Sequence, residues 1–91
     1  MAVDKDLIKL AALEFVLIEM LCREYQRYPD PVKTASDHRA HLRRILRETR
    51  VPGLDPALSD VGMSELEAAV DSIVEQAGRR AGQIADEQRR P

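Results

Sequence analysis

Three segments of the chain carry hydrophobic residues at helical spacing, and links that contain proline and glycine separate them. The first includes the stretch LAALEFVLIEMLC, residues 10–22, which is apolar at eleven of its thirteen positions. We expect a first helix over about residues 4–27, ending before the prolines of YPDP because proline cannot continue a helix. The segment TASDHRAHLRRILRETR predicts a second helix over residues 36–50, capped by Ser36 or Asp37 and closed by VPG.

The third helix has the most distinct predicted start. In the sequence SELE, Ser64 lies at the N-cap position and Glu67 follows three residues later, which is the spacing of a capping box. Apolar residues then recur every three or four positions, which predicts an amphipathic helix over residues 64–88. The preceding segment VPGLDPALSDVGM, residues 51–63, contains two prolines and two glycines and is predicted to be a loop. The C-terminal tail ADEQRRP is expected to fray.

The composition favours helices throughout. With no Trp, one Phe and two Tyr, the core has to be built from aliphatic side chains, which suit helices better than sheets. The sequence therefore predicts an all-α fold, with residues 1–91 as a single domain. Because a chain this short buries only a modest core, we expect its three helices to belong to an oligomeric helical bundle.

The middle of the first helix is apolar on every side. The face expected to be covered by the other two helices consists of Leu7, Ala11, Ile18, Leu21 and Tyr25, with Ile8, Ala12, Phe15 and Cys22 beside it. The apolar residues left over on the other side are Leu13, Val16, Leu17 and Met20. A helix that is apolar all round is a buried helix, and three helices are too few to surround one. We therefore expect a second copy of the chain to cover these four residues in a two-fold dimer, with binding to a different protein as the alternative.

Glu14 is predicted to lie inside the first of these faces, and no basic residue stands three or four positions away from it. Burying an unpaired carboxylate is costly, so we expect Glu14 to meet an arginine from another helix or subunit. The functional alternative is a ligand or proton-transfer group in a cavity of the bundle.

His38 and His41 are three residues apart, a spacing that can chelate a metal ion. No cysteine lies nearby, and His38 shares a helix face with Leu42 and Ile45. The sequence therefore favours a hydrogen-bonded histidine at the edge of the core over a metal ligand.

Charge is distributed unevenly along the chain. Residues 31–50 contain six Lys or Arg against two Asp or Glu, whereas the whole chain has a net charge of −2. The basic surface predicted on the second helix consists of Arg39, Arg43, Arg44, Arg47 and Arg50. Such a stripe can track phosphates, or it can be a solvated helix face that pairs with the acidic first and third segments. The pI near 5.6 and the absence of interleaved aromatic residues favour pairing over nucleic-acid binding.

The single cysteine, Cys22, excludes an intrachain disulfide, and its place in the apolar run predicts a buried thiol and a cytoplasmic location. The start MAVDKDLIK shows no signal-peptide pattern. The apolar run is interrupted by Glu14 and Glu19, and it is shorter than the roughly 20 residues of a membrane span.

The chain has a long first helix, a DP link, a short second helix with several arginines and a third helix ending near Gln83. This outline is similar to that of the small all-helical chorismate mutases. The resemblance would imply dimers that use Arg, Lys and Glu or Gln around a dicarboxylate. The first helix, LIKLAALEFVLIEMLCREYQ, departs from that family because its apolar centre lacks the cationic residues of such a site.

The sequence contains no nucleophile paired with a base, no glycine-rich phosphate loop and no cysteine cluster, so it predicts no catalytic, cofactor-binding or metal site. We expect a non-catalytic oligomerisation or interaction module, acting as a regulatory or adaptor protein. The first alternative is a nucleic-acid-binding regulator that uses the arginine-rich second helix. The second is a small-ligand binder or enzyme built around Glu14.

Overall fold

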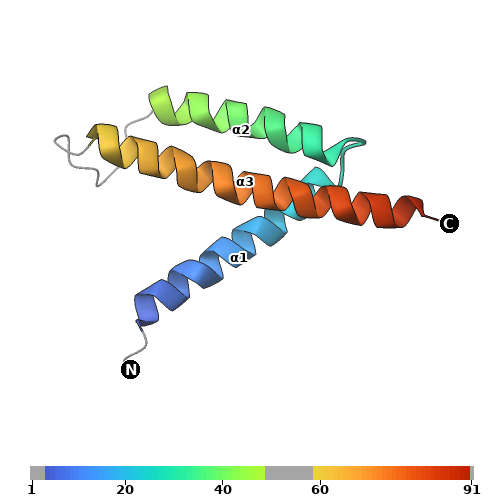
Figure 1. Ribbon diagram of the computed structural model, residues 1–91, viewed down its shortest axis with the longest axis horizontal. Helices are drawn as coiled ribbons and strands as arrows, with labels where there is room; N and C mark the ends of the chain where they lie inside the picture. The colour runs from blue at the N-terminus through green and yellow to red at the C-terminus, as the bar shows by residue number, and fades with distance from the viewer. Residues whose placement is uncertain (1–3, 49–58, 91) are drawn as a thin grey trace.

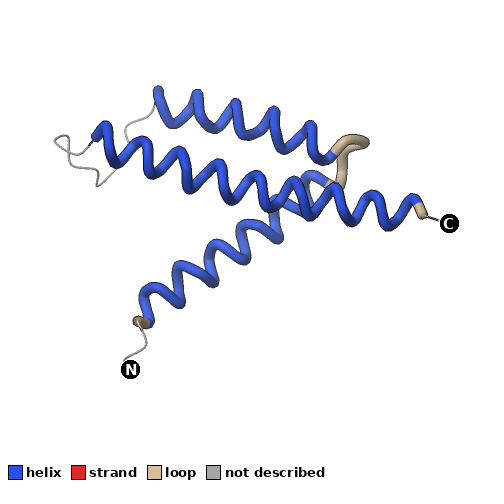
Figure 2. The backbone as a smooth tube through the Cα atoms, viewed as in Figure 1, coloured by secondary structure: helices blue, strands red, loops and turns tan. Residues whose placement is uncertain are grey.

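The computed structural model describes residues 4–48 and 59–90, and every regular element in these ranges is a helix (Figure 1, Figure 2). The helices are α1 (Lys5–Tyr25), α2 (Pro31–Glu48) and α3 (Ser59–Arg89). The predicted all-α chain of three helices is therefore confirmed. Arg50 and residues 51–58 of the predicted loop lie outside the described residues.

The first helix begins where the sequence predicts. Asp4 is its N-cap, and the carboxylate oxygen Oδ1 of Asp4 accepts hydrogen bonds from the backbone N–H groups of Asp6 and Leu7, at 3.0 and 3.3 Å. These contacts satisfy two of the donors that a helix start leaves without partners. α1 ends at Tyr25, ahead of the first proline.

The second helix begins five residues earlier than predicted, and neither Ser36 nor Asp37 caps it. Pro31 is its first residue, and the side chain of Asp30 accepts a hydrogen bond from the backbone N–H of Lys33 at 3.2 Å. Proline suits the first position of a helix, because the N–H group that it lacks has no intrahelical acceptor there. In YPDP the second proline therefore starts a helix, whereas the prediction treated both prolines as breakers.

The third helix also begins earlier, at Ser59, so the predicted loop ends before that residue and Ser64 is not an N-cap. The carboxylate of Glu67 does not complete a capping box; it pairs with Arg47 of α2, with Oε1 and Nε separated by 3.3 Å. At the other end, helical structure continues through Arg89, whose guanidinium donates a hydrogen bond to the carbonyl oxygen of Pro29 at 3.0 Å. The expected frayed tail is thus helical as far as that residue.

The core lies where the three helices meet. α2 lies alongside α3, and α1 crosses α3 and then diverges from both neighbours toward its N-terminus (Figure 1). The buried apolar residues are Cys22, Tyr25, Ala35, Val74, Ala77 and Ala81, and the partly buried residues packed against them are Ile18, Leu21, Leu42, Val70 and Ile84. The predicted burial of the Cys22 thiol is confirmed. Every α1 residue in this core lies at Ile18 or beyond, so α1 is anchored only by its C-terminal third.

The molecule is flat. Its Cα atoms span 54 × 40 × 15 Å, and the shortest dimension is close to the diameter of one helix with its side chains, about 10–12 Å. No helix is enclosed on all sides in such an arrangement.

Candidate interaction surface

α1 exposes a large apolar surface. The eight residues of this surface, called here the α1 apolar surface, are Leu7, Ile8, Leu10, Leu13, Phe15, Val16, Leu17 and Met20. Each is between 48% and 63% exposed. Isolated exposed apolar residues are ordinary, but eight within fourteen consecutive positions of one helix are not. All four residues predicted to meet a partner belong to this surface.

The surface is larger than the sequence predicted. Leu7, Ile8, Ala11, Ala12 and Phe15 were expected to be covered by the other two helices, and all five are exposed. The prediction was wrong for these residues because it placed the three helices side by side along their whole lengths. In the structure α1 diverges from α3 on the N-terminal side of their crossing (Figure 1).

The same divergence leaves Glu14 exposed, so this carboxylate is not buried within a single copy of the chain. The half-buried carboxylate of α1 is instead Glu19, whose Oε1 lies 2.5 Å from Nη1 of Arg80 on α3. Sequence reasoning missed this ion pair because its two members are sixty-one positions apart. The pair marks the point at which α1 crosses α3.

A polar contact ties the end of α1 to α2. The hydroxyl of Tyr25 lies 2.6 Å from Nδ1 of His38, and the two rings are T-shaped with centroids 5.7 Å apart. Burial raises the pKa of Tyr25 to about 12, so the phenol keeps its proton at neutral pH. The prediction of a hydrogen-bonded histidine at the core edge is confirmed for His38. His41 is exposed, and no group of three potential metal ligands occurs among residues 4–48 and 59–90.

A titration tests the environment of Tyr25. In a Tyr28→Phe variant, Tyr25 is the sole tyrosine, and tyrosinate absorbance near 295 nm should rise with a midpoint near pH 12 in the native protein. In guanidinium chloride the midpoint should fall to about 10, the value of an unperturbed tyrosine. Because the pKa is higher in the folded state, its stabilising contribution is complete below pH 10 and is lost as the pH rises to 12, by up to about 1.4 kcal/mol per pH unit. A native midpoint equal to the unfolded one would contradict the buried position of this ring.

Two arginines of the predicted basic surface pair with acids of α3. Arg43 makes a bidentate contact with Asp71, in which Nε donates to Oδ1 at 3.2 Å and Nη2 donates to Oδ2. These hydrogen bonds and the charge of Asp71 raise the pKa of Arg43. Arg47 pairs with Glu67. Arg47 follows Arg43 by four residues on α2, and Glu67 precedes Asp71 by four residues on α3, as expected for two ion pairs between antiparallel helices. That matched spacing of opposite charges was the sequence signal that could have identified the pairs.

The remaining described arginines of the basic surface are Arg39, which is half-buried, and Arg44, which is exposed. The stripe therefore offers fewer free guanidinium groups to a phosphate backbone than its sequence suggested, because Arg43 and Arg47 hold α2 against α3. This pairing weighs against the nucleic-acid alternative.

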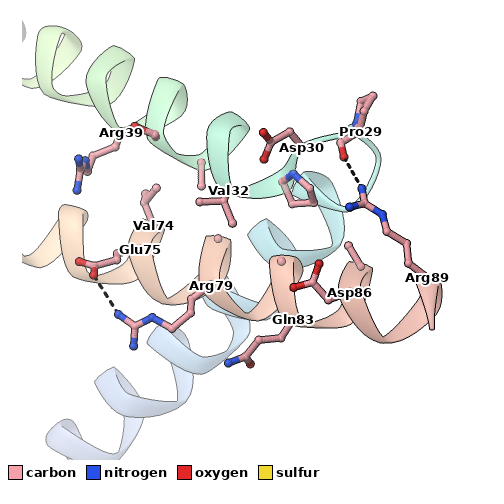
Figure 3. A pocket seen from close by; sticks show the side chains of 16 residues that line it. Pro29, Asp30, Val32, Arg39, Val74, Glu75, Arg79, Gln83, Asp86 and Arg89 are labelled. Carbon is pink, nitrogen blue, oxygen red and sulfur yellow. Dashed lines mark hydrogen bonds and ion pairs between the residues drawn. The ribbon is translucent and has the colours of Figure 1, made fainter.

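A groove of about 680 Å³ runs between α2 and α3 (Figure 3). Its charged lining residues are Arg39, Arg79 and Arg89 together with Asp30, Glu75 and Asp86. Arg79 is paired with Glu75 at 3.0 Å, and Arg89 is engaged by the Pro29 carbonyl. The lining thus carries three acidic and three basic side chains, with no excess of either charge. Glu14 does not line this groove, so the groove does not support the ligand-binding alternative built around that residue.

Comparisons with protein-family models, with curated proteins and with solved structures gave no significant match. None of the helices in the described part of the chain is long and apolar enough to cross a membrane.

Proposed function

We propose that this protein is a small non-catalytic interaction module that self-associates through the α1 apolar surface and serves as a regulatory or adaptor protein. The observation that supports the proposal most strongly is the exposure of eight large apolar side chains on one helix. Contiguous exposed apolar patches of this kind mark sites of protein association.

Energetics support self-association. Covering one large aliphatic side chain that is already half-buried gains about 1 kcal/mol, since full burial contributes about 1.5–3 kcal/mol. A chain of 91 residues whose described part has six buried apolar core residues is expected to be only marginally stable as a monomer. A second copy of the same chain supplies apolar surface without requiring any other component, and two-fold dimers are the commonest homo-oligomers. The single buried cysteine accords with a cytoplasmic location for this module.

Size-exclusion chromatography with light scattering tests the proposal on the full chain, with absorbance recorded at 260 and 280 nm at low and high salt. The proposal predicts a mass of twice 10.3 kDa, an absorbance ratio typical of protein, and association that high salt does not weaken. With two tyrosines and no tryptophan, the chain absorbs weakly, so bound nucleic acid would dominate the ratio. A strong 260 nm signal that high salt removes would favour the arginine-rich helix and overturn the proposal.

A further inference from the structure

The α1 apolar surface extends around the whole helix. Between Leu7 and Ile18, the only charged residues are Lys9 and Glu14. Leu7, Ile8 and Leu13 lie on three different sides of the helix, because successive residues are rotated by 100°. A single neighbouring helix covers one stripe of such a cylinder, so burying all sides requires contacts with at least two elements.

One stripe of this surface continues directly out of the core. Ile8, Phe15 and Cys22 are seven residues apart and therefore lie on one side of α1. Cys22 is 2% exposed, whereas Phe15 is 62% and Ile8 is 53% exposed. The stripe thus passes from the packed core to solvent at the point where α1 leaves α3.

A matching stripe occurs on α3. Leu66, Ile73 and Arg80 are also seven residues apart, and Arg80 contacts α1 through its ion pair with Glu19. Leu66 and Ile73 therefore lie on the side of α3 that faces α1 at the crossing, and they precede Arg80 in the sequence. Toward the N-terminus of α3, α1 diverges from it (Figure 1). Leu66 and Ile73 are only partly buried. The apolar residues Ile8 and Phe15 of α1 and the apolar residues Leu66 and Ile73 of α3 consequently flank the region between the diverging helices.

The area that a dimer needs distinguishes two ways of pairing. A buried aliphatic side chain removes on the order of 80 Å² from solvent, so Leu13, Val16, Leu17 and Met20 alone would bury only about 300 Å² per copy. A stable interface buries roughly 800 Å² per partner. Contact through these four residues alone is too small, whereas all eight residues together with the α3 stripe approach that size.

We propose that the N-terminal half of α1 from a second copy lies between the diverging α1 and α3 helices, so that the two chains interlock about a two-fold axis. This inference rests on the proposed function and adds Leu66 and Ile73 of α3 to the interface. Each α1 then contacts the partner's α1 on one side and the partner's α3 on another. Together these two contacts cover the α1 apolar surface, whereas a single neighbouring helix would cover only one side of it.

Photo-crosslinking within the 91-residue chain tests this arrangement. Ile73→p-benzoyl-phenylalanine protein is mixed with nitrogen-15-labelled unmodified protein, refolded together and irradiated. The crosslinked tryptic peptides are then identified by mass spectrometry. The interlocked dimer predicts crosslinks from position 73 to the labelled peptide of residues 10–23, which trypsin releases by cleaving after Lys9 and Arg23. The same probe at Leu66 provides an independent position, and a probe at Ile45 of α2 should give no such product.

Two other outcomes would overturn the inference and are distinguishable from each other. If the protein has a dimer mass but labelled crosslinks arise only from a probe at Met20 and none from positions 66 or 73, the copies pair side by side. In that case the interlocked arrangement is wrong and the proposed function stands. If the protein is monomeric and no crosslink joins labelled to unlabelled chains, both proposals are wrong.

Discussion

A Met20→Glu substitution is expected to convert the dimer into a monomer. Met20 is 62% exposed in a single copy and is not part of the core cluster, so the folded monomer should tolerate a glutamate there. In the two-fold dimer the same change removes an apolar contact and introduces a buried carboxylate twice. The loss is at least about 3 kcal/mol, which raises the dissociation constant more than about 100-fold. Light scattering at several protein concentrations measures the change in this dissociation constant.

The matched control for this prediction is Ile45→Glu. Ile45 is an apolar residue with 41% exposure on α2, outside both stripes of the proposed interface. The substitution introduces the same charge as Met20→Glu. Because Ile45 lies outside the proposed interface, the oligomeric mass should stay unchanged, and any general effect of a glutamate on solubility should appear in this variant as well. Equal masses for the Met20→Glu variant and the unmodified protein would show that this face of α1 is not an interface.

Replacing Gly78 with alanine is expected to destabilise the fold by about 1–2 kcal/mol. Gly78 is buried, and a Cβ atom there would come closer to the Cβ of Ala35 on α2 than such atoms approach in proteins. Overpacking of this kind costs about 1–3 kcal/mol, and the higher helix propensity of alanine offsets up to about 1 kcal/mol of it. Because Ala35 has no flexible side chain, only a shift of the helix backbones can relieve the contact. Chemical denaturation followed by circular dichroism gives the free energy of unfolding.

Gly82→Ala is the control, since the same substitution is made one turn later on the same helix. Its new Cβ would lie 2.8 Å from Cγ2 of Val32, which belongs to a side chain that is 57% exposed and can rotate away. The variant should therefore remain within about 1 kcal/mol of the unmodified protein. If Gly78→Ala were as stable as Gly82→Ala, α2 and α3 would not approach each other as closely as the structure shows.

The sequence allowed the helices to be predicted more reliably than their packing. The apolar run of residues 10–22 and the heptad-like spacing in the third helix identify helices from local information alone. Two helix starts were misplaced because competing local signals exist: Pro31 both breaks a preceding helix and begins a following one, and Ser64 fits a capping box although α3 already includes it. Cap patterns do not reveal how far a helix extends beyond them.

The packing of α1 could not be predicted from local sequence patterns, because it depends on the direction that α1 takes away from its crossing with α3. Glu14 was expected to be buried because its helix face also carries Ile18 and Tyr25, and those two residues do pack against the other helices. Four residues earlier, the same face is exposed. Helical periodicity predicts which residues share a face. Which other helix packs against that face, and over what length, depends on long-range contacts such as the ion pair between Glu19 and Arg80.

Sedimentation equilibrium of the unmodified 91-residue chain at several concentrations shows whether a second copy covers the α1 apolar surface. We expect a single species of twice 10.3 kDa at micromolar concentration, with an unchanged mass when the salt concentration is raised. A mass of 10.3 kDa across the whole concentration range would contradict this expectation, because eight large apolar side chains would then remain uncovered in solution.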